Sequence, residues 1–274
     1  MKFGRNSTTE KSEAINVLVI ATRHDSHAQL VCRALEAGKH VFVEKPLALT
    51  PEELAQVVKT YQAMSTQRAV PLLMVGFNRR FAPQVHKMKV LLDRVQAPKS
   101  FIMTVNAGAV PPQHWTQDPQ VGGGRIIGEG CHFIDLLRFL AGCPITAVQG
   151  TMLGTASEGD VHEDKMSFTL TFADGSFGTV HYLANGHRSF PKERLEVFCA
   201  GRVLQLDNFL SLRGYGWPGF KNMRLWRQDK GHKAELQAFI KAIQDGQPSP
   251  IPFEELVEVT RVSFEVVEAA RRNA

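Results

Sequence analysis

The chain has 274 residues, of which 43% are hydrophobic, enough to bury one large core or two ordinary ones. Its 32 basic and 27 acidic residues leave a net charge of +5 that is spread along the chain, so no basic block indicates nucleic-acid binding. No stretch reaches the about 18 apolar residues of a membrane-spanning helix, and the polar start lacks the apolar segment of a signal peptide. We therefore expect a cytoplasmic protein with neither nucleic acid nor membrane as partner.

The four cysteines carry no metal-site or disulfide signal. Cys32, Cys131, Cys143 and Cys199 form no C-x-x-C pair and have no histidine at metal-ligand spacing. We predict reduced thiols and no metal ion.

The first third of the chain alternates short apolar runs with amphipathic helical patterns. This alternation is typical of βαβ units around a parallel sheet. It predicts strands over residues 16–22, 40–46 and 72–81, and helices over residues 26–38, 50–64 and 82–94. We assign residues 1–95 to a dinucleotide-binding domain of Rossmann type.

From about residue 100 the pattern changes to β-rich segments of alternating polarity. The turns ADGS and CAGR lie between such segments and predict antiparallel hairpins. Helical patterns at 126–141, 232–245 and 253–272 are expected to cover one face of the resulting sheet. The predicted fold is thus α/β: a partial Rossmann-type parallel sheet followed, over residues 96–274, by an α+β domain with a large, mostly antiparallel open-faced sheet for substrate binding and oligomerisation. Its C-terminal helices are expected to pack back on the first domain.

Four segments resemble one family in order and spacing. They are ATRHDSHAQL (21–30), EKPLA (44–48), GFNRRF (76–81) and GGGRIIGEGCHFIDLLRFLAG (122–142). Together they resemble the glucose-fructose oxidoreductase and inositol dehydrogenase (Gfo/Idh/MocA) family. The resemblance implies an NAD- or NADP-dependent oxidoreductase acting on a sugar, cyclitol or nucleotide-sugar. The stretch from residue 202 also resembles the subgroup fused to zinc-type alcohol dehydrogenases and associated with polysaccharide biosynthesis.

Lys45 and His132 are the predicted acid/base pair. Lys45 follows a predicted strand, where the ligand crevice of an open α/β sheet lies, and burial there would lower its pKa. The alternative is a solvated lysine at the start of a loop. In the family, the histidine at the position of His132 exchanges the proton of the substrate hydroxyl. Asp135, three residues on, is expected to orient the ring, and the alternative is a structural histidine.

The resemblance also implies a set of cofactor contacts. Thr22, His24 and His27 are expected near the nicotinamide ribose and pyrophosphate, and Glu44 near the ribose or carboxamide. The remaining expected contacts are Lys45, Pro46, Asn78, Arg80 and Trp115. For Glu44 the alternative is a surface carboxylate, and of the pair Arg79 and Arg80 only one is expected to face the site.

The sequence departs from the family in several places. No G-x-G-x-x-G precedes a helix in the first half, so we expect an N-terminally truncated Rossmann domain lacking its first βαβ unit, with weakened or lost dinucleotide binding. The first predicted strand would then have an exposed apolar edge, which predicts a homo-oligomer. Gly128 stands where the family often has Asp, leaving Glu129 as a candidate catalytic carboxylate, and Thr116 stands where an Arg is common.

Two functions remain open from the sequence. The first is a dehydrogenase that transfers a hydride between NAD or NADP and a hydroxyl group. The second is a catalytically incomplete fragment or subunit that retains the fold and acts through a partner chain, which is favoured by the missing glycine loop. The substrate and the choice between NAD and NADP are not determined by the sequence.

Overall fold

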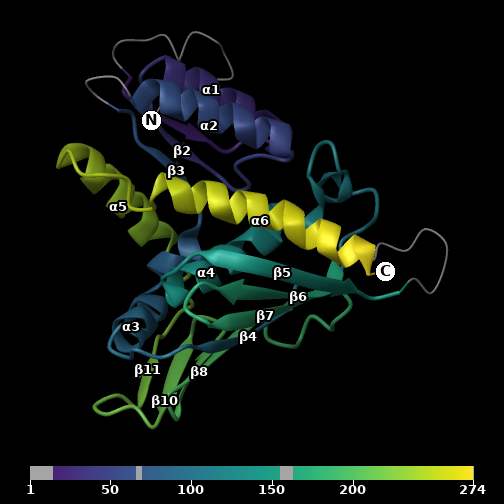
Figure 1. Ribbon diagram of the computed structural model, residues 1–274, viewed down its shortest axis with the longest axis vertical. Helices are drawn as coiled ribbons and strands as arrows, with labels where there is room; N and C mark the ends of the chain where they lie inside the picture. Colours follow the sequence, from purple (N-terminus) through teal and green to yellow (C-terminus); the bar gives the residue numbers. More distant parts are fainter. Residues whose placement is uncertain (1–14, 66–69, 155–162, 274) are drawn as a thin grey trace.

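The computed structural model describes residues 15–65, 70–154 and 163–273. The polar start, from which the absence of a signal peptide was predicted, lies almost wholly outside these ranges. Within them, no helix is long and apolar enough to cross a membrane. Two sheets stand one above the other, with helices between and around them (Figure 1).

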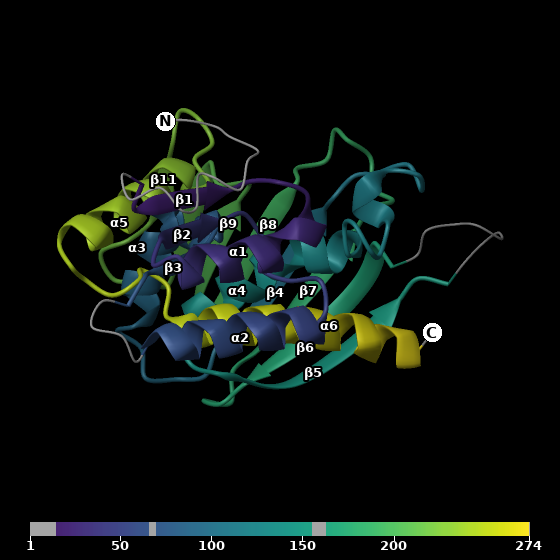
Figure 2. The same cartoon turned by 90° about the horizontal axis from the view of Figure 1, so that it is seen from above.

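The first sheet is parallel, as predicted. It has the order β1-β2-β3, with β1 at Val17–Ile20, β2 at His40–Val43 and β3 at Leu73–Val75. The connecting helices are α1 (His27–Glu36) and α2 (Pro51–Ser65), and they lie side by side along the sheet (Figure 2). The β2 and β3 strands are almost wholly buried, which explains their unbroken apolar sequence.

The predicted strand over 72–81 was too long. β3 ends at Val75, and a 3-10 helix, η2 (Asn78–Phe81), follows it before α3 (Pro83–Leu92). The chain turns here because Arg79 and Arg80 find carboxylate partners in the second half of the protein, which a continued strand would not reach.

The second sheet has eight strands in the order β11-β10-β9-β8-β4-β7-β6-β5. Its strands are β4 (Ser100–Asn106), β5 (Ile145–Met152), β6 (Lys165–Phe172), β7 (Phe177–Leu183), β8 (Glu193–Cys199), β9 (Arg202–Asp207), β10 (Ser211–Tyr215) and β11 (Asn222–Arg224). The predicted hairpins at ADGS and CAGR are confirmed as β6–β7 and β8–β9. Only β4 and β7 pair in parallel, because the chain enters the sheet in its middle.

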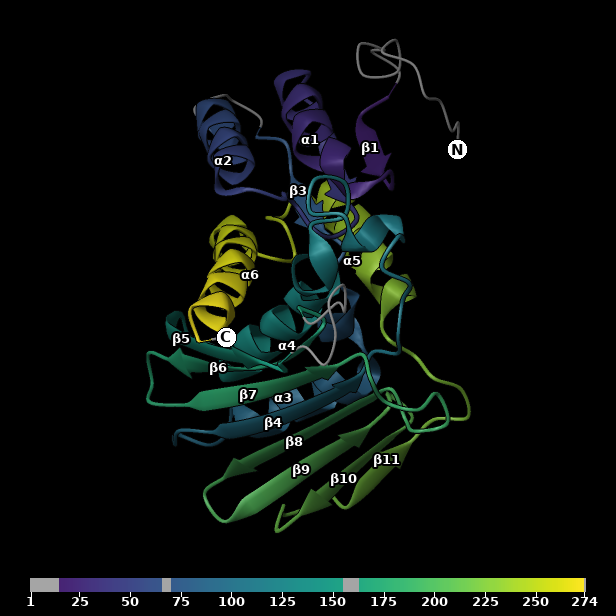
Figure 3. The same ribbon diagram turned by 90° about the vertical axis from the view of Figure 1, so that its right-hand side faces the viewer.

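Helices cover one face of this sheet and leave the other open (Figure 3). The predicted helix over 126–141 begins with a π-helical turn, η4 (Ile126–Gly130), and continues as α4 (Cys131–Ala141). The last helix, α6 (Phe253–Arg272), lies along β5. Gly150 of β5 is required there, since a Cβ atom would stand 3.0 Å from the backbone nitrogen of Ala270.

The C-terminal helices also contact the first sheet and its helices. Phe253 at the start of α6 stacks on Tyr61 of α2, with ring centroids 3.8 Å apart. The helix α5 (His232–Gln244), expected on the second sheet, instead packs against η2 and places Phe239 5.9 Å from Phe42 of β2. Phe239 of α5 therefore joins the core beside the first sheet.

A buried ion pair joins η2 to α4. Arg80 donates to both oxygens of Asp135, and its third contact is a 2.9 Å ion pair with Glu255 of α6. The side chains of Arg80 and Asp135 are 4% and 1% exposed. Burial raises the pKa of Asp135 to about 6, and the Arg80 guanidinium opposes that rise. The part of the chain that forms the first sheet and the part that forms the second are thus joined by a buried ion pair, in which neither charge is stable without its partner.

We expect Arg80→Met to lower the free energy of unfolding by roughly 3–5 kcal/mol, because it leaves Asp135 buried without its counter-ion. Arg261→Met removes an exposed pair with Glu265 on α6 and should cost at most about 1 kcal/mol. The double variant Arg80→Met, Asp135→Leu should recover a large part of the loss. Denaturant unfolding measures all three, and equal losses for the two arginines would contradict the assignment.

Candidate active site

The carboxyl ends of the three parallel strands meet the N-terminal end of η4 and α4. Lys45, two residues after β2, donates from Nζ to the carbonyl oxygen of Gly128 at 2.7 Å. This bond holds the ammonium group on η4, the turn that leads directly into the helix that carries His132. The structure therefore brings Lys45, which follows a strand of the first sheet, close to the helix that carries His132, the other predicted acid/base residue.

His24 forms a second contact between the halves. Its Nδ1 lies 2.8 Å from the carbonyl oxygen of Gly122, and its ring packs edge-on against Trp115 with centroids 4.8 Å apart. Burial is the main cause that lowers the pKa of His24 to about 4. The residue standing where the family often has Asp is Gly128, and a Cβ atom there would lie 3.0 Å from Cε1 of His24. The glycine thus accommodates the imidazole.

Of the predicted cofactor contacts on the first loop, Thr22 is exposed and His27 is not. His27 is fully buried, with Nδ1 2.8 Å from the carbonyl oxygen of Pro46 and Nε2 3.2 Å from that of Thr22. Both ring nitrogens are therefore occupied by the chain. His27 holds the loops after β1 and β2 together, and the predicted direct contact with a cofactor does not fit this geometry.

His132 lies in the first turn of α4 and is 6% exposed. Its Nδ1 is buried and has no hydrogen-bond partner among the described residues. Burial, reinforced by the charges of Arg79 and Lys45, lowers the pKa of His132 well below its ordinary value of 6.5. The imidazole is therefore neutral at physiological pH, which is the form that accepts a proton.

The predicted role of Asp135 in orienting His132 is wrong. Both carboxylate oxygens of Asp135 accept from Arg80, so neither faces the imidazole. The same pair removes Arg80 from the predicted cofactor contacts, since its guanidinium is buried between Asp135 and Glu255. Helical spacing alone placed Asp135 near His132, but a charge 55 residues away binds it more strongly.

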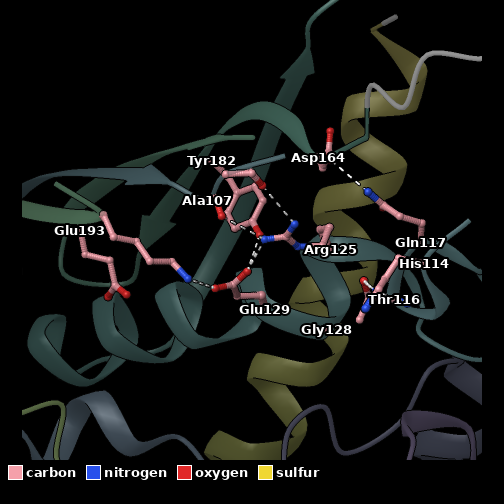
Figure 4. Close-up of polar contacts among 12 residues, drawn as sticks. Ala107, His114, Thr116, Gln117, Arg125, Gly128, Glu129, Asp164, Tyr182 and Glu193 are labelled. Carbon is pink, nitrogen blue, oxygen red and sulfur yellow. Dashed lines mark hydrogen bonds and ion pairs between the residues drawn. The ribbon is translucent and has the colours of Figure 1, made fainter. Parts of the chain in front are cut away.

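Glu129 is the centre of a polar cluster (Figure 4). Its Oε2 accepts from Arg125 at 2.7 Å and from the Tyr182 hydroxyl at 2.6 Å, and its Oε1 accepts from Lys192 at 2.8 Å. Although burial raises the pKa of Glu129, these three donors hold it well below its ordinary value. A carboxylate so stabilised is a poor proton acceptor, so the geometry favours a positioning role for this predicted catalytic residue.

A second cluster, not predicted from the sequence, lies beside the first. Glu193 accepts two bonds from Arg79, each 2.8 Å long, and one from Lys230 at 2.5 Å. The Arg79 guanidinium also lies 4.9 Å from the ring centroid of Phe133. Of the arginine pair, Arg79 is thus the member near His132. In the sequence, the polar dipeptide Lys192-Glu193 at the start of a strand was the feature that could have indicated this cluster.

The last two predicted contacts lie on the strand ends beside α5. The amide of Asn78 donates to the carbonyl oxygen of Lys230 at 2.7 Å, so it fixes the start of α5. Glu44 lies beside Gly76, where a Cβ atom would stand 3.1 Å from the Glu44 carboxylate. Glu235 of α5 is 2% exposed, and its Oε1 has no partner among the described residues.

Burial, together with the charges of Glu44 and Asp135, raises the pKa of Glu235 to about 9. The folded protein therefore keeps this proton between about pH 4.5 and about pH 9, where the unfolded chain has lost it, and stability falls as pH rises through that window. We expect Glu235→Gln to raise the free energy of unfolding by roughly 1–3 kcal/mol at pH 8 and by much less at pH 5. Thermal unfolding at the two pH values measures this difference.

The control is Glu254→Gln, which changes an exposed glutamate in the first turn of α6. It should have little effect on the melting temperature at either pH. An equal shift from both variants, or a gain from Glu235→Gln that is no larger at pH 8, would contradict the interpretation.

The parallel sheet with polar residues at its strand ends, joined to an open-faced sheet, defines an α/β protein of the dinucleotide-binding oxidoreductase class. Comparison with known proteins supports this class. Residues 6–71 match the model of an oxidoreductase family described as an NAD-binding Rossmann fold, and residues 94–204 match the C-terminal domain model of the same GFO/IDH/MocA family. The chain belongs to the Gfo/Idh/MocA family.

Several relatives are similar over most of the chain. It is 26% identical to inositol 2-dehydrogenase from Rhizobium meliloti, covering 86% of this chain and 73% of that protein. It is 29% identical to inositol 2-dehydrogenase 2 from Paenarthrobacter aurescens, covering 88% and 74%. Neither family match extends to a zinc-type alcohol dehydrogenase, so the predicted fusion stays a prediction.

Solved structures share the fold. An oxidoreductase domain protein from Kribbella flavida superposes with a TM-score of 0.83 at 23% identity, over 97% of this chain and 81% of that one. A levoglucosan dehydrogenase in complex with NADH and levoglucosan superposes with a TM-score of 0.81 at 24% identity, over the same shares. The predicted fold class is confirmed.

Proposed function

We propose that the chain is an NAD-dependent oxidoreductase that transfers a hydride between nicotinamide and a CH–OH group of a sugar or cyclitol. The observation that carries the proposal is the bond from Lys45 to η4, the turn that leads directly into α4, where His132 is buried and neutral. The relatives named inositol dehydrogenase support this reading over that of a catalytically incomplete fragment.

The residues at the strand ends fit the nicotinamide half of such a cofactor. Thr22 presents an exposed hydroxyl after β1, Trp115 a half-buried indole, and Lys45 an ammonium between them and α4. We propose that these side chains, with Glu44, would hold the nicotinamide and its ribose. When bound, nicotinamide supplies the acceptor for the hydride that leaves the substrate carbon.

His132 would take the proton of the substrate hydroxyl as the C–H bond breaks. Its neutral imidazole can accept this proton, and the reverse reaction returns it. Lys45 would donate a hydrogen bond to the same oxygen and stabilise the charge that develops on it. Because cations near His132 disfavour the imidazolium, they also favour the return of the proton to solvent or to product.

The first experiment is calorimetric titration of the chain with NADH and NADPH, followed by turnover of inositol and levoglucosan with NAD. We expect saturable NADH binding and, for His132→Ala and Lys45→Ala, a loss of kcat of about a hundredfold or more. Since the pKa of His132 is lowered, oxidation should keep its rate as pH falls from 8 to about 6.5.

His86→Ala is the control, because His86 lies exposed on α3, and its rate should equal that of the wild type. Absence of NADH binding would overturn the proposal and favour the incomplete fragment. Turnover that both active-site variants leave unchanged would refute the roles of the two residues even where NADH binds.

We further propose a cytoplasmic homodimer built on the open face of the second sheet, and a domain boundary near residue 95. The strand registers place an apolar row across that face, because Ser100 pairs with Phe177 and Phe198, Phe198 with Val203, and Val203 with Tyr215. Phe177, Phe198 and Tyr215 are 47%, 42% and 50% exposed. A second copy would cover this row.

Phe198→Glu should therefore shift a dimer to a monomer in a sizing run with light scattering, because it places a charge in the centre of the row. Phe190→Glu is the matched control, since Phe190 is 58% exposed in the loop before β8 and should leave the dimer intact. A wild-type monomer at micromolar concentration, or dissociation by both variants, would count against this face.

A further inference from the structure

Two carboxylates beside His132 are each bonded by two cations. Glu129 binds Arg125 and Lys192. Glu193 binds Arg79 and Lys230. Four positive charges thus oppose two negative ones, and the two clusters are continuous because Lys192 and Glu193 are neighbours at the start of β8.

Several of these positive charges act on the helix turn that carries His132, one of the predicted acid/base pair. Arg79, Lys45, His232 and Lys230 are the groups whose charges lower the pKa of His132, and all four are basic side chains. The Arg125 guanidinium lies 5.6 Å from the ring centroid of Tyr182, whose hydroxyl bonds Glu129. The positive charges of Arg79, Lys45 and Lys230 therefore act on the end of α4 where His132 lies.

The members of the clusters differ in their access to solvent. The side chains of Arg79 and Arg125 are only 6% and 8% exposed, so their charges are fixed by the fold. Lys192 is 41% exposed and Lys230 is 16% exposed. Each ammonium has three donor hydrogens, and the structure gives the accessible Lys192 one carboxylate partner, which leaves donors for a ligand.

We propose that the substrate carries an anionic group, a carboxylate or a phosphate, which Lys192 binds while His132 and Lys45 act on a hydroxyl of the same molecule. This inference rests on the proposed function and names its substrate class. An anion would complete the charge balance of the two clusters, and the bond to Lys192 would be a charge-assisted one.

The cofactor phosphates are a less suitable partner for this charge. Thr22 and His24 follow the first parallel strand, and His24 contacts Trp115 and Gly122. Lys192 and Lys230 instead lie directly before β8 of the second sheet and in the segment before α5. The basic clusters are therefore carried by other segments of the fold than the loop after β1.

The test measures binding of D-glucuronate, D-glucose 6-phosphate and neutral D-glucose to the full chain by ligand-observed NMR, with and without NADH. We expect at least one anionic sugar to bind about tenfold tighter than glucose, and the difference to shrink at high salt. Lys192→Met should abolish the difference and Lys192→Arg should retain it. Glu129 keeps Arg125 and Tyr182 as partners in both variants.

Lys241→Met is the control, because it removes an exposed lysine paired with Asp245 on α5 and should retain the preference. A preference for glucuronate alone would identify the group as a carboxylate, and one for the phosphate ester alone would identify a phosphate. Equal binding of all three sugars, or a preference that survives Lys192→Met, would overturn the inference.

The two proposals fail separately. Preference for an anionic sugar without any NADH binding would refute the dehydrogenase and leave the substrate site standing. NAD-dependent turnover of neutral polyols, with no gain for the anionic sugars, would leave the dehydrogenase standing and refute the anionic substrate.

Discussion

The buried pair between Arg80 and Asp135 is the constraint on which the rest of the arrangement depends. Two charges so far from water are stable only when each has its partner in place, which fixes the position of η2 against α4. Asp135 and His132 lie on the same helix, α4, so the pair also fixes the position of the helix that carries His132. The interaction that joins the two halves of the protein therefore sets the geometry of its site, although neither partner takes part in the proposed chemistry.

The charges around His132 serve the site in two ways. Burial and the nearby charges of Arg79, Lys45 and Lys230 disfavour the imidazolium, which keeps the base free of a proton at neutral pH. The charges also produce a positive field that suits an anionic ligand. The paired cations hold the pKa of Glu129 and of Glu193 low, so both carboxylates stay charged and fix the positions of these cations. Each of these carboxylates positions its paired cations, and because its pKa is low it is a poor proton acceptor.

The sequence predicted local structure well and long-range partners poorly. Unbroken apolar runs and the hairpin turns at ADGS and CAGR locate nearly every strand, because these signals depend on residues close in the chain. Lys45 and His132 were predicted through motifs at strand and helix ends, and the structure bonds Lys45 to the turn before the helix of His132. The choice of Arg80 for a cofactor contact failed for a different reason: its carboxylate partners are 55 and 175 residues away. Burial of a charge is decided by such distant partners, and no local pattern encodes them.

The candidate site is formed by the part of the chain with the first sheet together with the part with the second, and neither part contains the whole site. Lys45 belongs to the first sheet but is held by the carbonyl of Gly128 in the second half. His24 likewise bonds Gly122 across the same boundary. A substrate between Lys45 and His132 would therefore contact both halves at once, while an anionic group on it would be bound by the second half only. The first half would then supply the nicotinamide contacts and one acid/base group, and the second half the choice of substrate. Changes in specificity should therefore be sought at the start of β8, away from the parallel strands.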